Sequence, residues 1–418
     1  MIVPFGESGA GSELYLPQRR HPAGGPGDVW EAATGELAGA LFASLTRRDQ
    51  RQKGEQYLRG LLQARGRKSI RNIAAHVGGP AAEQSLHHFI SSSTWDWMPM
   101  REALARHLAR TAAPQAWVVG PMPIPKAGDQ SVGVEQGFDQ CQGQSFHGQQ
   151  AFGVFYASEL LTVPVHWRLF LPGSWLRDDL RRRRAEIPEG IAEETLPDCA
   201  VAAFTESVGS WRVPARPVVL NTYVDRVAAT VDRFTAAGLP VVARVSGTSR
   251  LEVRDPALPG YGGGPLAAQR ILASVKGLRR RSTWGGPTGA GGSLTVAVRV
   301  GPADGSGRAR RPGSGDGDRD RDLLLLGEWV DPDSSPVALW VTNLASAPAG
   351  ALLRLTKLAG RACRDLTGVG EEVGLRDFEG RSFRGWHRHI SLASAAHAVT
   401  AMAGVGGSPA EYPAPRSA

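Results

Sequence analysis

Apolar side chains recur at helical spacing through the first quarter of the chain. Leu37, Leu41 and Leu45 lie four residues apart, and a second apolar stripe runs through 57–62. Such spacing places the apolar side chains on one face of a helix. We therefore expect a helical domain over residues 30–113.

Two short helices of this domain are joined by a turn. One is expected over 69–77, the run Gly78-Gly79-Pro80 ends it, and the next is expected over 82–90. Two short helices around a Gly-containing turn resemble a helix-turn-helix, in which one helix enters the major groove of DNA. An ordinary helical bundle with a solvated basic face fits the same pattern.

From residue 116 onward the pattern changes to short apolar or alternating runs, which are typical of strands. Strand, helix and strand follow one another over 216–245, an order that favours a mixed α/β sheet. A long helix is expected over 349–373. The strands are expected over 116–119, 152–156, 161–171, 216–220, 241–245, 294–300, 323–329 and 338–342.

A region of different composition interrupts this sheet. Residues 303–322 alternate Gly, Arg and Asp without large apolar side chains, which is typical of a disordered loop. We expect this loop to lie inside a β-rich insertion over 266–335. The other expected parts are a flexible tail over 1–29, a core formed by 114–265 and 336–400, and a second tail over 401–418.

The charge balance points to an anionic partner. The chain of 418 residues has a formal net charge of +8 and a pI near 9.8, and such an excess attracts polyanions, most often nucleic acid. The excess is concentrated between Arg47 and Arg71, where nine Lys or Arg residues stand against two acids. DNA is therefore the expected partner.

Cysteine usage and hydropathy exclude other classes. Three cysteines without a CxxC pair indicate neither a disulfide framework nor a structural zinc site, and no cofactor is expected. A reducing cytoplasm fits this usage best. No apolar run approaches the ~20 residues of a membrane span, and the N-terminus lacks the layout of a signal peptide.

Short blocks spread over most of the chain carry a family resemblance. They are Glu83–Leu86, Phe89–Ser91, Trp95–Trp97, Ser131–Val134, Val163–Val165, Trp167–Leu169, Leu171–Pro172, Trp211, Pro217–Val219, Gly374–Leu375 and Phe378–His389. Together they resemble the DDE insertion-sequence transposases of the group numbered seven-oh-one, and Phe378–His389 looks like the tail of the active-site helix. The resemblance implies a bacterial DNA-binding protein with an RNase H-like mixed sheet, a helical N-terminal domain and a β-rich insertion before the last active-site helix.

Such transposases hold two divalent cations between three carboxylates, which activate water or a 3′-hydroxyl for phosphoryl transfer. By the resemblance, the first aspartate is expected where Gly120 and Pro121 stand, the second where Asn221 stands, and the glutamate where Cys363 stands. The active site therefore looks degenerate, and neither a catalytic residue nor a bound metal is expected.

Neighbouring acids are poorly placed to replace this triad. Asp365 lies two positions from Cys363, which is a rotation of about 200° onto the opposite face of the helix. Glu371 lies eight positions on, about 12 Å along the helix axis. We expect neither side chain to reach the same metal.

Several residues are candidates for contacts with DNA. Arginine can bind phosphate with two parallel hydrogen bonds, and the resemblance implies a tryptophan in the insertion that stacks on a flipped base. Each candidate also has a structural interpretation, in which His389 fixes a helix end and Trp284 fills a core. The candidates are Arg67, Lys68, Arg71, Arg280, Trp284, Arg381, Arg384, His387 and His389.

Three functions follow from these observations. The leading hypothesis is a transposase-family DNA-binding protein, domesticated or decayed, that has lost strand transfer; a homodimer is a possible assembly. The second is a repurposed enzyme that uses the vacated cleft for chemistry on a small-molecule substrate, with Cys363 as nucleophile and His147 as its partner. The third is a DDE transposase that remains active with displaced carboxylates.

Overall fold

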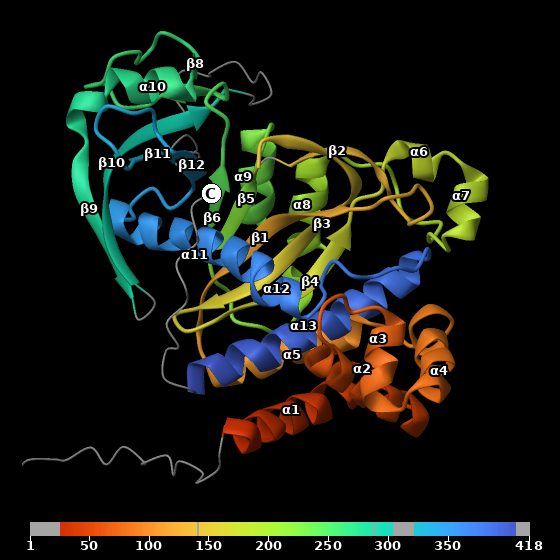
Figure 1. Ribbon diagram of the computed structural model, residues 1–418. Coiled ribbons are helices and arrows are strands. Elements are labelled where there is room, and N and C mark those ends of the chain that lie inside the picture. Colours follow the sequence, from red (N-terminus) through yellow and green to blue (C-terminus); the bar gives the residue numbers. More distant parts are fainter. Residues whose placement is uncertain (1–25, 140–141, 287–288, 304–321, 407–418) are drawn as a thin grey trace, which may run out of the picture.

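A mixed sheet forms the centre of the molecule (Figure 1). Strand β1 (Pro114–Pro125) pairs antiparallel with β3 (Gln144–Ser158), and β3 pairs antiparallel with β4 (Thr162–Leu169). On its other side β1 is parallel to β5 (Val218–Tyr223), which is parallel to β6 (Val241–Arg244). This order of antiparallel and parallel strands gives the RNase H-like fold, which confirms the expected fold class.

The computed structural model describes residues 26–139, 142–286, 289–303 and 322–406. The tails expected over 1–29 and 401–418, and the loop expected over 303–322, fall largely outside these residues. Where the described residues reach the expected tails, they are helical, since α1 begins at Pro26 and α13 continues to Gly406.

Helices cover both faces of the central strands. Trp117 of β1 packs against Phe204 of α8 (Leu196–Thr205), whereas Asn221 of β5 contacts α11 (Ala349–Thr367). Trp117 is in register with Val218, and positions 218 and 221 lie on opposite faces because side chains alternate along a strand. Burial on both faces explains why these strands are nearly continuous apolar runs. Helix α9 (Val227–Ala236) packs beside α8 through Phe234.

The insertion extends the same sheet and does not form a separate one. Strand β12 pairs antiparallel with β6, and β11, β10, β7 and β8 continue the order, with β9 also paired to β10. Because β7 lies in this group, the β-rich part begins before the expected residue 266. The bounds are β7 (Arg250–Val253), β8 (Leu266–Ala267), α10 (Ala268–Ser274), η2 (Lys276–Leu278), β9 (Arg280–Gly286), β10 (Gly289–Pro302), β11 (Leu323–Trp329) and β12 (Ala338–Thr342).

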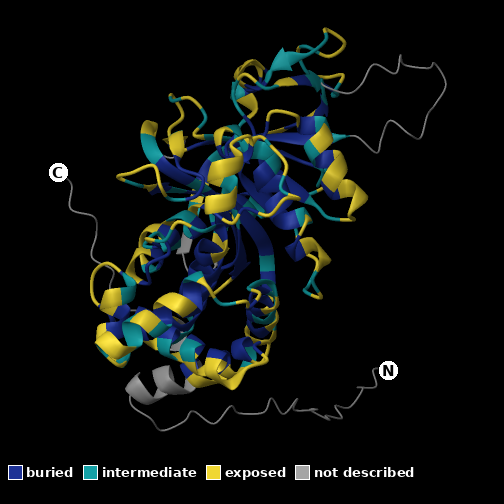
Figure 2. Ribbon diagram, turned by 90° about the vertical axis from the view of Figure 1, so that its right-hand side faces the viewer, coloured by how far each residue is buried: buried dark blue, intermediate teal, exposed yellow. Residues whose placement is uncertain are grey.

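The helices expected at the N-terminus are present. Ser69 caps α3 by accepting a hydrogen bond from the Asn72 amide at 3.2 Å. Gly79 joins α3 to α4 with φ of 62°, a left-handed conformation that favours glycine. The exposed residues of these helices lie on their outer side (Figure 2). The bounds are α1 (Pro26–Phe42), α2 (Arg48–Gln63), α3 (Ile70–Val77), α4 (Pro80–Ser91) and α5 (Met98–Thr111).

A long buried helix, α13 (Phe383–Gly406), joins the N-terminal helices to the sheet. It packs against α1, α2, α4 and α5 on one side and against β4 on the other. The expectation that Phe378–His389 is the tail of the active-site helix is therefore wrong, because α11 ends at Thr367 and α12 (Val369–Glu372) intervenes. The remaining elements are β2 (Glu135–Asp139), α6 (Gly173–Leu176), α7 (Asp179–Arg184) and η1 (Val208–Ser210).

Candidate functional site

The positions expected for the metal-binding acids converge where β1, β5 and α11 meet. Val119 is in register with Leu220, so Gly120 and Asn221 are neighbours on the face that α11 covers. The Asn221 side-chain amide donates a hydrogen bond to Cys363 Sγ at 3.2 Å. Pro121 follows on β1 and takes the opposite face. The structure thus brings Gly120, Asn221 and Cys363 to one place.

The donor chemistry of this place is neutral. Asn221 is buried, with 8% of its surface exposed, and Cys363 is half-buried. A Cβ atom added to Gly120 would meet only Phe155 Cε2, at 3.8 Å, so packing leaves room for a side chain that the residue lacks. Hard divalent cations such as Mg²⁺ prefer carboxylate oxygens. A glycine, an amide and a thiol therefore do not fit the pair of metal ions that the resemblance to transposases implies.

The acids of the neighbourhood point elsewhere, as expected. Asp365 turns to β4, where Thr162 contacts its carboxyl group, and burial raises the pKa of Asp365 to about 6. Two strands, β3 and β1, separate β4 from β5, so Thr162 lies about 14 Å across the sheet from the strand that carries Asn221. Glu371 pairs with Arg376 at 2.6 Å. Among the described residues, no three His, Cys, Asp or Glu side chains are grouped so as to hold a metal ion.

The candidate pair of Cys363 and His147 does not form. His147 lies six residues before Gly153 on β3, and Gly153 is the strand partner of Gly120. At about 3.3 Å per residue, His147 is about 20 Å along the strand from the vacated position. Its Nε2 pairs with Asp129 at 3.0 Å. The placement of His147 beside Cys363 is therefore corrected.

Two histidines expected on a DNA-binding surface are buried instead. The Tyr57 hydroxyl donates to His389 Nδ1 at 2.8 Å, and His389 Nε2 donates to the Gly374 carbonyl at 2.8 Å. Burial lowers the pKa of His389 to about 4. His387 stacks on Trp97 with ring centroids 4.8 Å apart. Both side chains fasten α13 to the N-terminal helices, which supports the structural interpretation.

Lys68 is also a structural residue. Its side chain is buried, its Nζ donates to the Ala64 carbonyl, and its backbone amide donates to Asp377 Oδ2 at 2.7 Å. Burial lowers the pKa of Lys68. A buried ammonium of this kind does not face a phosphate in solution, so the assignment of Lys68 to a DNA surface is corrected.

The arginines among the candidates are exposed. Arg67 is partly engaged, since its Nε pairs with Glu379 at 3.2 Å. The other four form no salt bridge in the part of the chain that the structure describes, and all five lie on the surface. They are Arg67, Arg71, Arg280, Arg381 and Arg384.

Trp284 lies between two neighbours in the insertion. A Cβ atom added to Gly291 would approach Trp284 Cζ2 to 2.7 Å, so one face of the ring covers the backbone of β10. Lys357 Nζ lies 5.5 Å from the centroid of the ring and also pairs with the buried carboxylate of Glu328. In this arrangement the ring packs on its own sheet and is only partly exposed.

A buried arginine that the sequence pattern did not single out joins three elements. Arg101 of α5 donates to Ser391 Oγ at 2.6 Å, to the Trp167 carbonyl at 2.8 Å and to His387 Nδ1 at 3.1 Å. It also reaches His166 Nδ1 at 3.3 Å. Burial lowers the pKa of Arg101 to about 9. The sequence feature that could have identified Arg101 as buried is its position on the apolar stripe of α5, one turn before Leu104.

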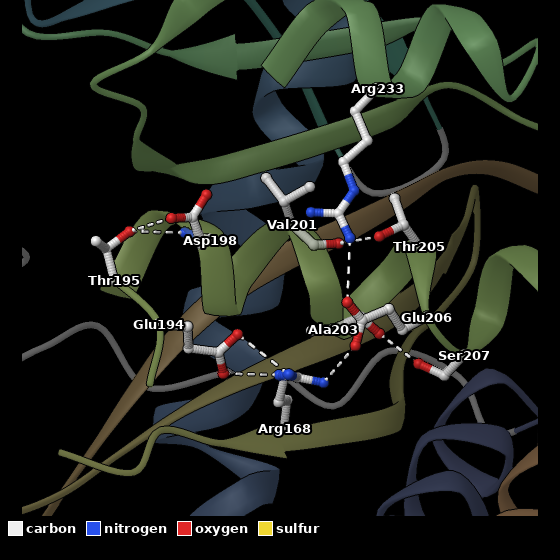
Figure 3. A network of polar contacts seen from close by, with 10 residues as sticks. All are labelled: Arg168, Glu194, Thr195, Asp198, Val201, Ala203, Thr205, Glu206, Ser207 and Arg233. Carbon is white, nitrogen blue, oxygen red and sulfur yellow. Dashed lines mark hydrogen bonds and ion pairs between the residues drawn. The ribbon is translucent and has the colours of Figure 1, made fainter. Parts of the chain in front are cut away.

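Another polar network lies on the opposite face of the sheet (Figure 3). Arg168 of β4 binds Glu194 at 2.9 Å and Glu206 at 3.0 Å, and Arg233 of α9 binds Glu206 at 3.2 Å. Neighbouring Cys199 is buried, which raises its pKa. These ion pairs attach α8 and α9 to the sheet, and the buried thiol is a packing residue.

A cavity of about 620 Å³ lies between the N-terminal helices and the loop that precedes α13. Tyr57 and His389 form part of its lining, together with Arg71, Glu83 and Asp377. Its lining carries both signs of charge. The cavity is separate from the place where β1, β5 and α11 meet.

Comparison with known families agrees with the fold. Residues 40–298 match the family described as DDE superfamily endonuclease. The match covers more than half of the chain, and the chain belongs to this family. DDE endonucleases act on DNA, which agrees with DNA as the expected partner. No curated protein matched the chain. Within the described residues, no helix is long and apolar enough to cross a membrane.

Proposed function

We propose that this chain is a transposase-derived DNA-binding protein of the insertion-sequence group seven-oh-one whose two-metal strand-transfer centre is lost. The observation that carries the proposal is the hydrogen bond of 3.2 Å between Asn221 and Cys363 beside Gly120. In a working centre these positions supply carboxylates. Here two of the three side chains are neutral and bound to each other, and the third is absent.

The electrostatics support this proposal. Two divalent cations carry four positive charges, and without carboxylates they meet no compensating charge in a partly buried place. Asp365 and Glu371 have other partners. An active transposase with displaced acids would need both the sheet and α11 to rebuild. A nucleophilic Cys363 would need a base, and His147 lies far along β3.

The binding part of the proposal rests on exposed arginines. Arg48, Arg59 and Arg65 lie on the surface of α2 and the loop that follows it. Arginine–phosphate contacts release condensed counterions, so they give salt-dependent binding that does not depend on sequence. Helix α4 carries no Lys or Arg and exposes Gln84, His87 and His88. In this proposal α2 contacts the phosphate backbone of DNA and α4 faces the edges of the DNA bases.

The domain organisation belongs to the same proposal. Residues 30–113 form the DNA-binding part, and 114–265 with 336–400 form a scaffold that retains the RNase H-like fold without its chemistry. The protein acts in the cytoplasm, where it would regulate or cooperate with an active relative. A homodimer would place two binding parts on one duplex.

Binding and cleavage test the two halves of the proposal separately. We expect the protein to retard a duplex in a gel, with an affinity that falls steeply as salt rises, and to leave plasmid DNA intact with Mg²⁺ or Mn²⁺. Arg48→Glu with Arg59→Glu should weaken binding at least tenfold. Arg270→Glu, which changes an exposed arginine of α10, is the matched control. Metal-dependent cleavage by the unaltered protein would overturn the loss of the centre.

Restoring the carboxylates gives a second test. The triple variant Gly120→Asp, Asn221→Asp and Cys363→Glu places three acids where the structure brings these positions together. We expect Mg²⁺ or Mn²⁺ to raise the melting temperature of the triple variant and to leave that of the unaltered protein unchanged. Equal metal responses of the two proteins would contradict the assignment of these positions.

A further inference from the structure

Helix α7, which lies outside the N-terminal helices, carries a run of four arginines, Arg181 to Arg184. Arg181 lies over the Trp175 ring, 5.3 Å from its centroid, and faces Asp178 at 3.7 Å. Arg182 turns inward and donates to the carbonyls of Pro188 at 2.7 Å and Ile191 at 3.1 Å. Arg183 and Arg184 are exposed, and among the described residues neither forms an ion pair, although the charge of Arg184 helps to lower the pKa of Asp178.

Both ends of α7 are fixed, so the backbone that carries its arginines is held in place. Asp178 caps the first turn by accepting from the amides of Leu180 at 2.9 Å and Arg181 at 3.0 Å. The last turn closes through the amide of Ile187, which donates to the Arg182 carbonyl at 3.0 Å. Glu186 adopts φ of 55° in this turn, a left-handed conformation that is rare outside glycine and typical of a helix end.

The start of α13 lies against this helix (Figure 1). The Phe383 amide donates to the Ala185 carbonyl at 2.7 Å. Arg184 precedes Ala185 and Arg384 follows Phe383, so both arginines lie beside this hydrogen bond. Arg381 lies three residues before Arg384, ahead of the start of α13. Segments about two hundred residues apart in the sequence thus bring their arginines to one surface. We call this surface the arginine surface; it consists of Arg183, Arg184, Arg381 and Arg384.

The nearby acids offset only part of this charge, and one of them, Glu186, is exposed beside Arg184. Asp178 caps α7 and faces Arg181, and Glu193 pairs with Arg177 at 2.7 Å. The pKa of Arg388 is lowered to about 10, mainly by burial and then by the positive charge of Arg384. Exposed like charges repel one another, and a polyanion relieves that repulsion. Planar guanidinium groups match the geometry of phosphate oxygens.

We propose that the arginine surface is a second phosphate-binding site, which holds the backbone of duplex DNA at a place distinct from α2–α4. The inference rests on the proposed function, since it takes DNA as the partner. It adds a role for Arg183 and Arg184 and explains why Arg381 and Arg384 stay exposed when the next residues of α13 are buried. A duplex that touches both places would span the N-terminal helices and the sheet.

Salt dependence of binding measures the number of phosphates contacted, because the logarithm of the affinity falls by about 0.9 per phosphate for each tenfold rise in salt. The full-length protein with Arg183, Arg184, Arg381 and Arg384 changed to Gln should bind a 30-base-pair duplex at least tenfold more weakly. Its salt slope should be smaller by about two to four. The matching change to Lys should keep most of the slope, and Arg270→Gln should leave it unchanged.

A second measurement does not depend on variants. Arginine modification by phenylglyoxal, read by mass spectrometry on the unaltered protein with and without the duplex, should show protection of these four arginines and not of Arg270. Unchanged slope together with unprotected arginines would overturn the arginine surface while leaving DNA binding by α2–α4 intact. Failure of the unaltered protein to bind DNA at any salt concentration would overturn both proposals.

Discussion

The comparison of two regions with polar side chains in the interior shows how differently such side chains are used. Where β1, β5 and α11 meet, Asn221 and Cys363 form one weak hydrogen bond beside Gly120. Where α5, β4 and α13 meet, Arg101 makes hydrogen bonds to two histidines, a serine and a backbone carbonyl. The first region has the place of a catalytic centre without its charges. The second region has a dense, buried hydrogen-bond network whose role is structural.

The comparison shows that a polar motif can belong to the packing of a fold. Phe378–His389 has the sequence of a conspicuous functional segment, yet Trp386, His387 and His389 are buried between the N-terminal helices and the sheet. Lys126 strengthens the same joint, since its Nζ donates to the Phe378 carbonyl at 2.7 Å. These side chains hold two parts of the chain together, whether or not the protein cuts DNA.

Acid should weaken the packing of α13, a helix of the second region, more than any single substitution does. Burial lowers the pKa of both His389 and His397 to about 4, from an ordinary value of 6.5. The unfolded chain therefore binds more protons between about pH 4 and 6.5, so the free energy of unfolding is full above pH 6.5 and falls as the pH drops through this window. Each histidine contributes about 3 kcal/mol in full, of which about 2 kcal/mol is lost between pH 7.5 and pH 5. Urea unfolding at pH 7.5 and 5 measures the loss, and equal stabilities would contradict it.

Arg101→Met should be the most damaging single change. It leaves the Nδ1 atoms of His166 and His387 and the Trp167 carbonyl without their donor in the interior, and unsatisfied buried groups cost about 1–3 kcal/mol each. We expect a loss of about 3 kcal/mol in the free energy of unfolding. The control is Arg106→Met, a change of a half-exposed arginine on the same helix whose partner is Glu102. A loss of stability no larger than that of the control would contradict the structural role assigned to the Arg101 network.

Cys363→Ala should cost much less. The thiol is half-buried and its hydrogen bond with Asn221 involves a weak acceptor, so we expect a loss of about 1 kcal/mol. DNA retardation should be unchanged in this variant. A loss as large as that of Arg101→Met would mean that the vacated centre has become a structural joint.

Gly120→Ala should have the smallest effect. The added Cβ meets only Phe155 Cε2 at an ordinary contact distance of 3.8 Å, and a strand favours alanine over glycine slightly. We expect a change within about 0.5 kcal/mol. Gly148→Ala on β3 is the contrasting control, because a Cβ there would approach the Ile124 carbonyl oxygen to 2.2 Å. Similar costs for the two variants would contradict the open space beside Asn221.

Much of the fold followed from the sequence. The strands expected over 323–329 and 338–342 have the observed bounds of β11 and β12, and α3 and α4 lie within two residues of expectation. These elements have strong local signals, such as a continuous apolar run or a Ser and Gly at the helix ends. The end of α11 was missed because Val369 and Val373 prolong the apolar pattern, whereas the backbone leaves the helix at Gly368.

The candidate site divides in the same way. The sequence by itself determined that Gly120, Asn221 and Cys363 carry no charge, because residue identity fixes the available chemistry. Only the tertiary structure decided that these positions meet, that His147 and Asp365 lie elsewhere, and that Lys68, His387 and His389 are buried. The physical reason is that charge and periodicity are local properties of a chain. Burial and contact depend on which distant segment packs against each side chain, as Arg101 and α13 do here.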